Sequence, residues 1–473
     1  MNGSNEKTSK PAEEKKSNEE LKIMEWRYSQ FLGEKLTHDQ IINEPENESF
    51  LVTNCKFSRD GQNVVVTDKG GRVILFKKNE TKNKQPKLDY FYEFAAQERE
   101  FDVHKSIEYT EEIRGLAILP STNANKVDIL TAGYRTIKFD RIHKEKIKVF
   151  DQSGAKGLSG PGKSIVIPKV TNVNTETKNK TKRVYKFIHN NEINTLCENK
   201  INTNNFMSSD EFKIFLWDLN VPNEVFNLVD IDPGTEMDNP EKITKSVVCD
   251  YNPHLFAYGT NKGNIKFCDL RTSSDSVTFS KNFLDENSNL NKTVFAQSLL
   301  GVHDLSVSFS NNYLLASRHF LSVNLWDLRK QNEPFTKFLV YEPVINKLSY
   351  LYQNNYLNDK FSISTDNNGK YIITGGYNNM FHVLDIEQRL NTQIVIDEMN
   401  EKLSNTNVIR KINSKGSCFY KKDDPNLSKI NFDKKILHQV YSPVENYSIM
   451  VIYNCLYTYT GSITKKENTS QKK

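Results

Sequence analysis

The sequence repeats one two-strand unit seven times, and this repetition constrains the fold more than any other feature. Each copy has an apolar run, a short break rich in Gly, Asn, Asp or Ser, and a second apolar run, which is typical of a β-hairpin. Another short strand precedes most copies, so each unit predicts about four strands. The copies occupy residues 64–76, 128–139, 205–217, 255–268, 313–326, 371–384 and 447–459.

The end of the unit carries the mark of WD repeats. Trp217 and Trp326 are each followed by Asp and Leu, and Cys268 and Leu384 stand at the same place in two other copies. Seven such units predict an all-β fold, a seven-bladed WD-repeat β-propeller whose closed ring leaves few strand edges exposed. Trp26 has two interpretations: it lies in a strand that completes the last blade, or it packs as an aromatic side chain on the rim.

The copies are spaced more widely than the usual WD repeat, so several blades must carry insertions. We expect a propeller over residues 23–462 between disordered polar tails at 1–22 and 463–473. Within it, we expect a projecting hairpin arm at 77–110, and loops or partly disordered insertions at 140–184 and 387–430.

Charge and cysteine content exclude several classes of protein. The chain has 64 basic and 59 acidic residues, so no overall field selects a nucleic acid or a membrane surface as partner. Its six cysteines form no C-x-x-C pair, and no apolar run approaches the ~18 residues of a membrane span. This pattern predicts a cytoplasmic protein, with the nucleus as the other reducing compartment that it allows.

One segment, GLSGPGKS at 157–164, satisfies the pattern of a nucleotide-binding P-loop, including Lys163 and Ser164. A P-loop needs a strand that runs directly into it and a helix that starts at the lysine. Here β-branched residues and Pro168 follow instead, so we favour a glycine-rich insertion without nucleotide.

The remaining polar residues predict no catalytic site, no metal and no cofactor. The nine histidines form no H-E-x-x-H motif and no cluster with acidic residues. His303 and Asp304 are adjacent and could act as an acid–base pair, but adjacency alone does not give catalytic geometry, and a role in holding a turn is favoured.

Acidic residues near the third blade suggest a protein-binding surface. Asp210, Glu211, Glu236 and Asp238 form either an acidic patch that attracts basic segments or ordinary solvated turn charges. Lys69, in a Gly-rich turn, is likewise either a rim contact or a simple turn lysine.

Several segments resemble the B-family WD-repeat regulatory subunits of protein phosphatase 2A (PP2A). The similarity is collinear from about Trp26 to Tyr459, and FNLVDI (226–231), GGYNN (375–379) and DKKILH (433–438) are typical of that family rather than of WD repeats in general. The resemblance implies a non-catalytic targeting subunit that docks on a helical-repeat scaffold, forms a heterotrimer with a catalytic subunit and recruits phosphoproteins with basic segments. The alternative is a WD-repeat scaffold of another complex.

The resemblance also implies roles for particular residues. A scaffold-binding arm matches Glu100, Phe101, Asp102, Lys105 and Ser106, and an acidic substrate groove matches Glu48, Lys69, Asp210 and Glu211. His319 replaces a groove carboxylate of the family, so we expect it to weaken attraction to a basic segment when protonated, below about pH 6.5.

Overall fold

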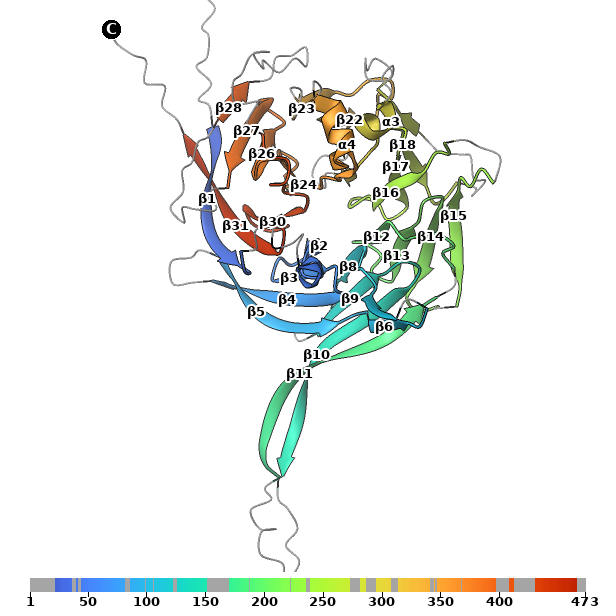
Figure 1. Cartoon of the computed structure of the whole chain (residues 1–473), viewed down its shortest axis with the longest axis vertical. Coiled ribbons are helices and arrows are strands. Elements are labelled where there is room, and N and C mark those ends of the chain that lie inside the picture. The colour runs from blue at the N-terminus through green and yellow to red at the C-terminus, as the bar shows by residue number, and fades with distance from the viewer. Residues whose placement is uncertain are drawn as a thin grey trace, which may run out of the picture.

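Seven β-sheets stand around a common axis and form a closed ring (Figure 1). The architecture is therefore the predicted seven-bladed β-propeller. The structure is a computed structural model, and it describes residues 22–35, 40, 44–80, 86–97, 99–104, 106–121, 126–150, 170–186, 188–221, 223–234, 239–272, 281–285, 295–307, 314–340, 344, 347–366, 368–396, 408–411 and 430–465.

The first three blades are antiparallel sheets in which the strands follow one another in chain order. Blade 1 has β2 (Val52–Phe57), β3 (Asn63–Asp68), β4 (Arg72–Glu80) and β5 (Pro86–Ala95); blade 2 has β8 (Gly115–Leu119), β9 (Lys126–Ala132), β10 (Ile137–Phe150) and β11 (Val170–Tyr185); blade 3 has β12 (Thr195–Glu198), β13 (Asn205–Ser209), β14 (Lys213–Asp218) and β15 (Val225–Asp230).

The next three blades repeat this order, and blade 6 adds a fifth strand. Blade 4 has β16 (Ile243–Val248), β17 (Leu255–Thr260), β18 (Ile265–Asp269) and β19 (Lys281–Phe283); blade 5 has β20 (Asp304–Val307), β21 (Leu314–Arg318), β22 (Ser322–Asp327) and β23 (Thr336–Leu339); blade 6 has β24 (Ile363–Thr365), β25 (Tyr371–Gly375), β26 (Met380–Asp385), β27 (Leu390–Val395) and β28 (Val408–Lys411).

Blade 7 closes the ring with strands from both ends of the chain. It contains β29 (Gln439–Tyr441), β30 (Tyr447–Ile452) and β31 (Cys455–Lys465), and β1 (Lys22–Leu32) pairs with β31 so that Trp26 lies opposite Gly461. Trp26 is buried against the rings of Phe381 and Tyr441. The first interpretation of Trp26, a strand that completes the last blade, is therefore correct.

The core lies between neighbouring blades, which explains why many strands read as continuous apolar runs. In β3, Val65 packs in a cluster with blade 2, whereas Val64 and Val66 pack with blade 7. Successive side chains of a strand point to opposite faces, so a blade covered on both sides needs apolar residues at every position. The innermost strands also contact one another in sequence around the axis, from β2 through β8 to β29 and back to β2.

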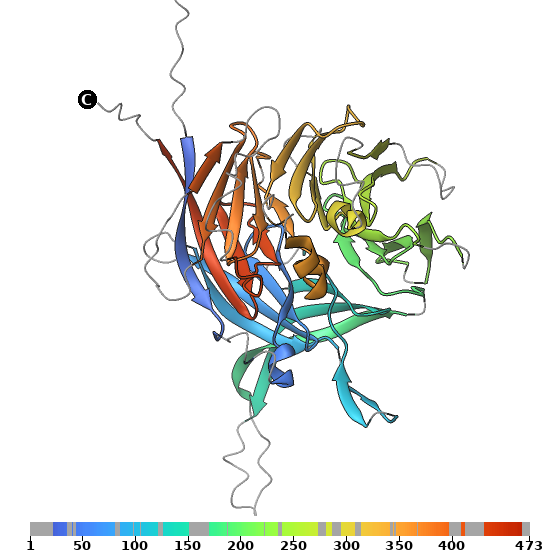
Figure 2. The ribbon, with the colours of Figure 1, turned by 45° about the horizontal axis from the view of Figure 1, so that its top comes forward.

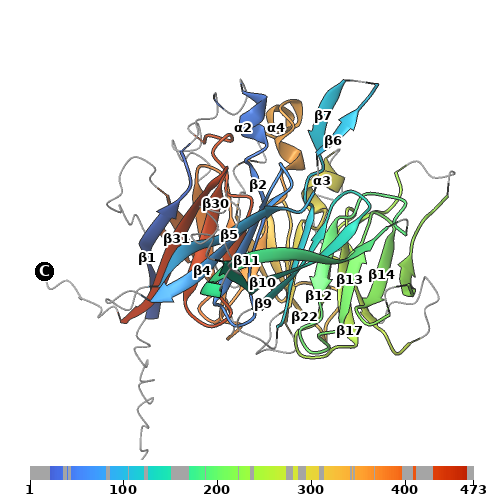
Figure 3. The ribbon, with the colours of Figure 1, turned by 90° about the horizontal axis from the view of Figure 1, so that it is seen from below.

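Short helices and one hairpin stand on the same side of the ring (Figure 3), which we call the upper face. They are α2 (Pro45–Glu48), α3 (Ala296–Leu300), α4 (Leu348–Gln353) with the 3₁₀ turn η4 (Tyr356–Asn358), and the hairpin of β6 (Arg99–Asp102) and β7 (Ile107–Thr110). The turns between the second and third strands of the blades share this side, because all blades have the same strand order. No helix in the described ranges is long and apolar enough to cross a membrane.

The two insertions near the start of the chain differ from our expectation. Residues 86–95 form the outer strand β5 of blade 1, so only β6 and β7 project as a hairpin. Residues 140–150 and 170–184, expected as loops, extend β10 and β11 into a long antiparallel ribbon that leaves the ring (Figures 1 and 2). The β-branched residues of these segments favour a strand over a loop. The part of the ribbon nearest the ring also packs on β5, where Tyr92 Oη donates to Asn179 Oδ1 at 3.3 Å.

Candidate functional site

Asp210 lies in the interior of blade 3 and cannot contact a substrate. Its Oδ2 accepts a hydrogen bond from His189 Nδ1 at 2.9 Å, and its Oδ1 accepts from the backbone N–H groups of Phe212 and Lys213. His189 Nε2 in turn lies 2.7 Å from Ser208 Oγ, which also accepts from the indole of Trp217 at 2.8 Å. The carboxylate thus fixes the turn after β13, which corrects the groove assignment of Asp210.

Glu211, the next residue, is partly exposed on the upper face. Its carboxylate pairs with Lys242 at 2.8 Å, and the two side chains are 36% and 40% exposed. Exposed ion pairs of this kind contribute about 0–1 kcal/mol, so another cation can replace Lys242 at small cost. Glu211 can therefore accept a basic segment, provided that the segment displaces this lysine.

Glu48 and Lys69 form a second pair on the same face. Glu48 ends α2, Lys69 lies in the turn between β3 and β4, and Lys69 Nζ is 2.6 Å from Glu48 Oε1. The two groove residues that the resemblance implied near blade 1 are therefore brought together. Their charges compensate each other in the free protein.

His319 is buried rather than exposed to a substrate. Its Nε2 lies 2.9 Å from Ser317 Oγ and its Nδ1 donates to the carbonyl oxygen of Leu300 at 2.7 Å. Ser317 Oγ also accepts from the indole of Trp326, which gives blade 5 a network like that of blade 3. Burial lowers the pKa of His319 to about 4, so the expected protonation near pH 6.5 is wrong.

The remaining groove residues lie outside the described residues. Glu236 and Asp238 fall in the 235–238 gap, so the acidic patch is described only in part. Within that part, Glu48 and Glu211 each face a lysine. The patch is consequently a set of exchangeable ion pairs.

The β6–β7 hairpin carries the residues that matched the scaffold arm. Glu100, Phe101 and Asp102 lie in β6, Ser106 adopts a left-handed conformation (φ 52°) in the turn, and Lys105 lies outside the described residues. Phe101 and Val103 are 58% and 76% exposed at the tip. An exposed apolar tip on a projecting hairpin is typical of a protein contact.

Two family-specific motifs pack against each other beside blade 7. The GGYNN segment places Gly375 so close to Ile436 of DKKILH that any Cβ would overlap the Ile436 carbonyl oxygen. Ile436 N donates to Gly376 O at 2.9 Å, and Asn378 and Asn379 adopt the left-handed conformations that asparagine tolerates. The motifs thus encode a junction between blades 6 and 7.

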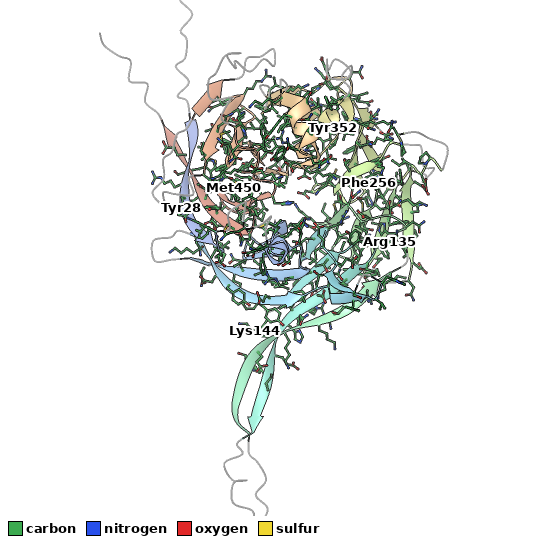
Figure 4. The ribbon with its side chains drawn as sticks, in the orientation of Figure 1. Tyr28, Arg135, Lys144, Phe256, Tyr352 and Met450 are labelled. Atoms are coloured by element: carbon green, nitrogen blue, oxygen red, sulfur yellow. The ribbon has the colours of Figure 1, made fainter. Side chains whose placement is uncertain are left out.

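Sequence reasoning missed the exposed aromatic residues of α4. Tyr350 and Tyr352 are 51% and 63% exposed on the upper face, and Figure 4 labels Tyr352 at the end of this helix. The helix has six residues, too few for a periodic pattern to show which side faces solvent.

The catalytic alternatives gain no support from the described residues. Asp304 accepts the backbone N–H of Ile363 at 2.9 Å and pairs with Lys245, so it links inner strands. The GLSGPGKS segment lies outside the described residues, and a strand rather than a helix runs from Val170 onward. No group of metal-ligating side chains occurs among the residues that the structure describes.

A comparison with protein-family models finds no match, whereas comparisons with curated proteins and solved structures do. Raptor of Chaetomium thermophilum is similar in fold alone, with a TM-score of 0.54 and 12% identity over 88% of this chain and 29% of Raptor. The regulatory subunit phr2AB of serine/threonine-protein phosphatase 2A from Dictyostelium discoideum is 27% identical, covering 93% of this chain and 99% of the relative.

A second curated relative, the B gamma isoform of the 55 kDa PP2A regulatory subunits from Oryctolagus cuniculus, is 29% identical over 88% of this chain and 94% of its own. Both relatives are named as regulatory subunits and not as enzymes, so the prediction of a non-catalytic regulator is confirmed. The chain is therefore similar, over about nine tenths of its length, to the PP2A regulatory subunits that its sequence motifs indicated.

Proposed function

We propose that the chain is a substrate-recruiting subunit of a PP2A heterotrimer, bound to a helical-repeat scaffold and a catalytic subunit. The observation that carries the proposal is the near end-to-end relation to phr2AB, which spans 99% of that regulatory subunit. Such a subunit contributes proximity: it holds a phosphoprotein beside the catalytic metals of another chain and raises the local concentration of the phosphorylated residue.

Substrate capture is assigned to the upper face. Basic residues of a substrate displace Lys242 from Glu211 and Lys69 from Glu48, and take their place in the ion pairs. Because each lysine already neutralises its carboxylate, we expect recruitment that depends strongly on salt and on the number of substrate cations. The five described cysteines are free thiols, which supports the cytoplasm and the nucleus as the working compartments.

Two hairpins are candidates for the scaffold contact. The motif match favours β6–β7, whose Phe101 and Val103 are exposed. The ribbon of β10 and β11 is favoured by geometry, because it extends farthest from the ring (Figure 1). It carries exposed lysines at 144, 146, 178, 180 and 182, of which Figure 4 labels Lys144.

Affinity purification of the tagged full chain tests the proposal. We expect scaffold and catalytic subunits of PP2A to co-purify, whereas a WD-repeat scaffold of another complex would bring down neither. Replacing 100–109 or, separately, 146–174 with a short Gly-Ser turn should identify the docking hairpin, because β5 and the blade portion of β10 stay intact. Retention of the scaffold by both variants would refute docking through either hairpin.

A further inference from the structure

Lys360 lies near the axis of the ring and forms no ion pair with any residue that the structure describes. Among the described residues, its exposed side chain makes no ion pair or hydrogen bond. The adjacent carboxylate of Asp359 is already engaged, because it accepts from Lys435 at 2.6 Å and from Tyr377 Oη at 3.0 Å. Lys360 lies just before β24, the innermost strand of blade 6, on the upper face.

Charged groups from several blades converge on this ammonium. Lys245 comes from β16 of blade 4, Arg114 directly precedes β8 of blade 2, and Glu211 lies in the turn of blade 3. Asp304 links Lys245 to the segment that follows Lys360: its Oδ1 lies 3.4 Å from Lys245 Nζ, and its Oδ2 accepts the backbone N–H of Ile363 at 2.9 Å. Desolvation by the surrounding blades, together with Lys245 and Arg114, lowers the pKa of Lys360, as expected for like charges held close together.

The carboxylates near this cluster are occupied by other partners. Glu192 pairs with Arg114, and Glu211 pairs with Lys242. Asp304 pairs with Lys245 at 3.4 Å while also accepting backbone N–H groups of Leu305 and Ile363. Among the described residues, each of these carboxylates thus pairs with another cation, and Glu211 acts on Lys360 without forming an ion pair with it.

The nearby histidines do not add charge at neutral pH. Burial and Lys245 lower the pKa of His438 to about 4, and burial, with Arg318, His319 and Lys360, lowers the pKa of His303. Arg318 is buried, donates to the carbonyl oxygens of His319 and Ser322 and covers the ring of Phe361. At neutral pH the positive charges of this cluster therefore come from lysine and arginine alone.

We propose that Lys360, Lys245 and Arg114 form a binding site for a phosphate group on a protein segment that lies across the upper face. The inference rests on the function proposed above and adds a second recognition element to it: basic residues of the substrate pair with Glu211, while a phosphorylated residue reaches the axis. A phosphate suits the site because its oxygens accept from several cations at once, including a guanidinium. The Glu192 side chain is 48% exposed, so Arg114 can exchange it for phosphate at small cost.

The catalytic metals belong to another subunit in the proposed heterotrimer, so the residue bound here is distinct from the one presented to the catalytic subunit. Substrates of this class carry at least two phosphorylated residues, and the one held at the axis is removed last. Recruitment would then weaken once the substrate is fully dephosphorylated.

Binding of labelled peptides to the purified full chain, followed by fluorescence anisotropy, tests the site. Three peptides share one Gly-Ser sequence with a central serine, phosphoserine or glutamate, and inorganic phosphate serves as competitor. We expect the phosphoserine peptide to bind at least tenfold tighter than either of the others, and phosphate to compete. Lys360→Glu should abolish this preference, and Lys245→Gln should reduce it.

Lys262→Glu is the matched control, because Lys262 is exposed in the turn between β17 and β18 on the same face. The site would be refuted if the three peptides bound equally well, or if the phosphoserine and glutamate peptides did. It would also be refuted if Lys360→Glu and Lys262→Glu lost the same affinity for the phosphoserine peptide. Co-purification with scaffold separates the two proposals: phosphopeptide binding without scaffold refutes the heterotrimer, and scaffold without phosphopeptide binding refutes only the site. Both lysine variants should melt like the wild type, since neither side chain lies in an apolar core cluster.

Discussion

Asp210 and Glu211 are adjacent carboxylates with opposite roles, and replacing each by alanine separates them. Asp210→Ala leaves the buried His189 ring without its acceptor and removes the acceptor of two backbone N–H groups. A buried donor left unsatisfied costs about 1–3 kcal/mol, and three donors lose their acceptor when Asp210 is replaced. We expect the free energy of unfolding to fall by about 3–5 kcal/mol.

Urea unfolding followed by tryptophan fluorescence measures this loss. Trp217 reports on the affected blade because its indole shares Ser208 with His189. The midpoint should move to lower urea with an unchanged slope. Glu211→Ala is the control and should cost less than about 1 kcal/mol, because its pair with Lys242 is exposed. A loss in Asp210→Ala no larger than in Glu211→Ala would refute the buried role of Asp210.

Three further changes test other parts of the structure. Glu211→Lys should weaken binding of a basic substrate peptide severalfold at low salt while scaffold co-purification persists; unchanged peptide affinity would contradict the exchange of ion pairs. Gly375→Ala should destabilise the blade 6–7 junction, since its Cβ overlaps Ile436 O, and a wild-type melting temperature would contradict that packing. His319 stays neutral in the folded protein, whereas in the unfolded chain it takes up a proton as the pH falls below about 6.5. The free energy of unfolding should therefore fall by about 2 kcal/mol between pH 7 and pH 5. Urea unfolding of His319→Asn at both pH values should lack this loss, and an equal pH dependence in both proteins would disprove it.

The ring could be predicted from the sequence because each hairpin is a local pattern. Strand pairs such as β13 and β14 need only alternating apolar residues and a short turn, and all seven predicted hairpins occur. The ribbon of β10 and β11 was missed because its exposed part is rich in Lys, Asn and Thr, which composition assigns to loops.

The candidate site was harder to predict, because burial of a turn carboxylate depends on partners far along the chain. Asp210 meets His189 from the preceding connection, whereas its neighbour Glu211 points to solvent, and no local pattern separates them. The cluster at Lys360 joins residues separated by up to about 250 positions, which become neighbours only when the ring closes. Family motifs named Glu48 and Lys69 as groove residues but could not indicate that these two side chains pair with each other.

The pairing of β1 with β31 has a consequence for synthesis of the chain. The strand that contains Trp26 cannot pair until Gly461, about 435 residues later, has been synthesised. At typical translation rates this synthesis takes about 20 to 90 s. During that time a strand with Met24 and Trp26 on its apolar side has no partner, and the six finished blades form an open arc. Nascent chains that lack β31 should therefore depend on chaperones that shield exposed strand edges, and deletion of β31 should be as damaging as deletion of β1.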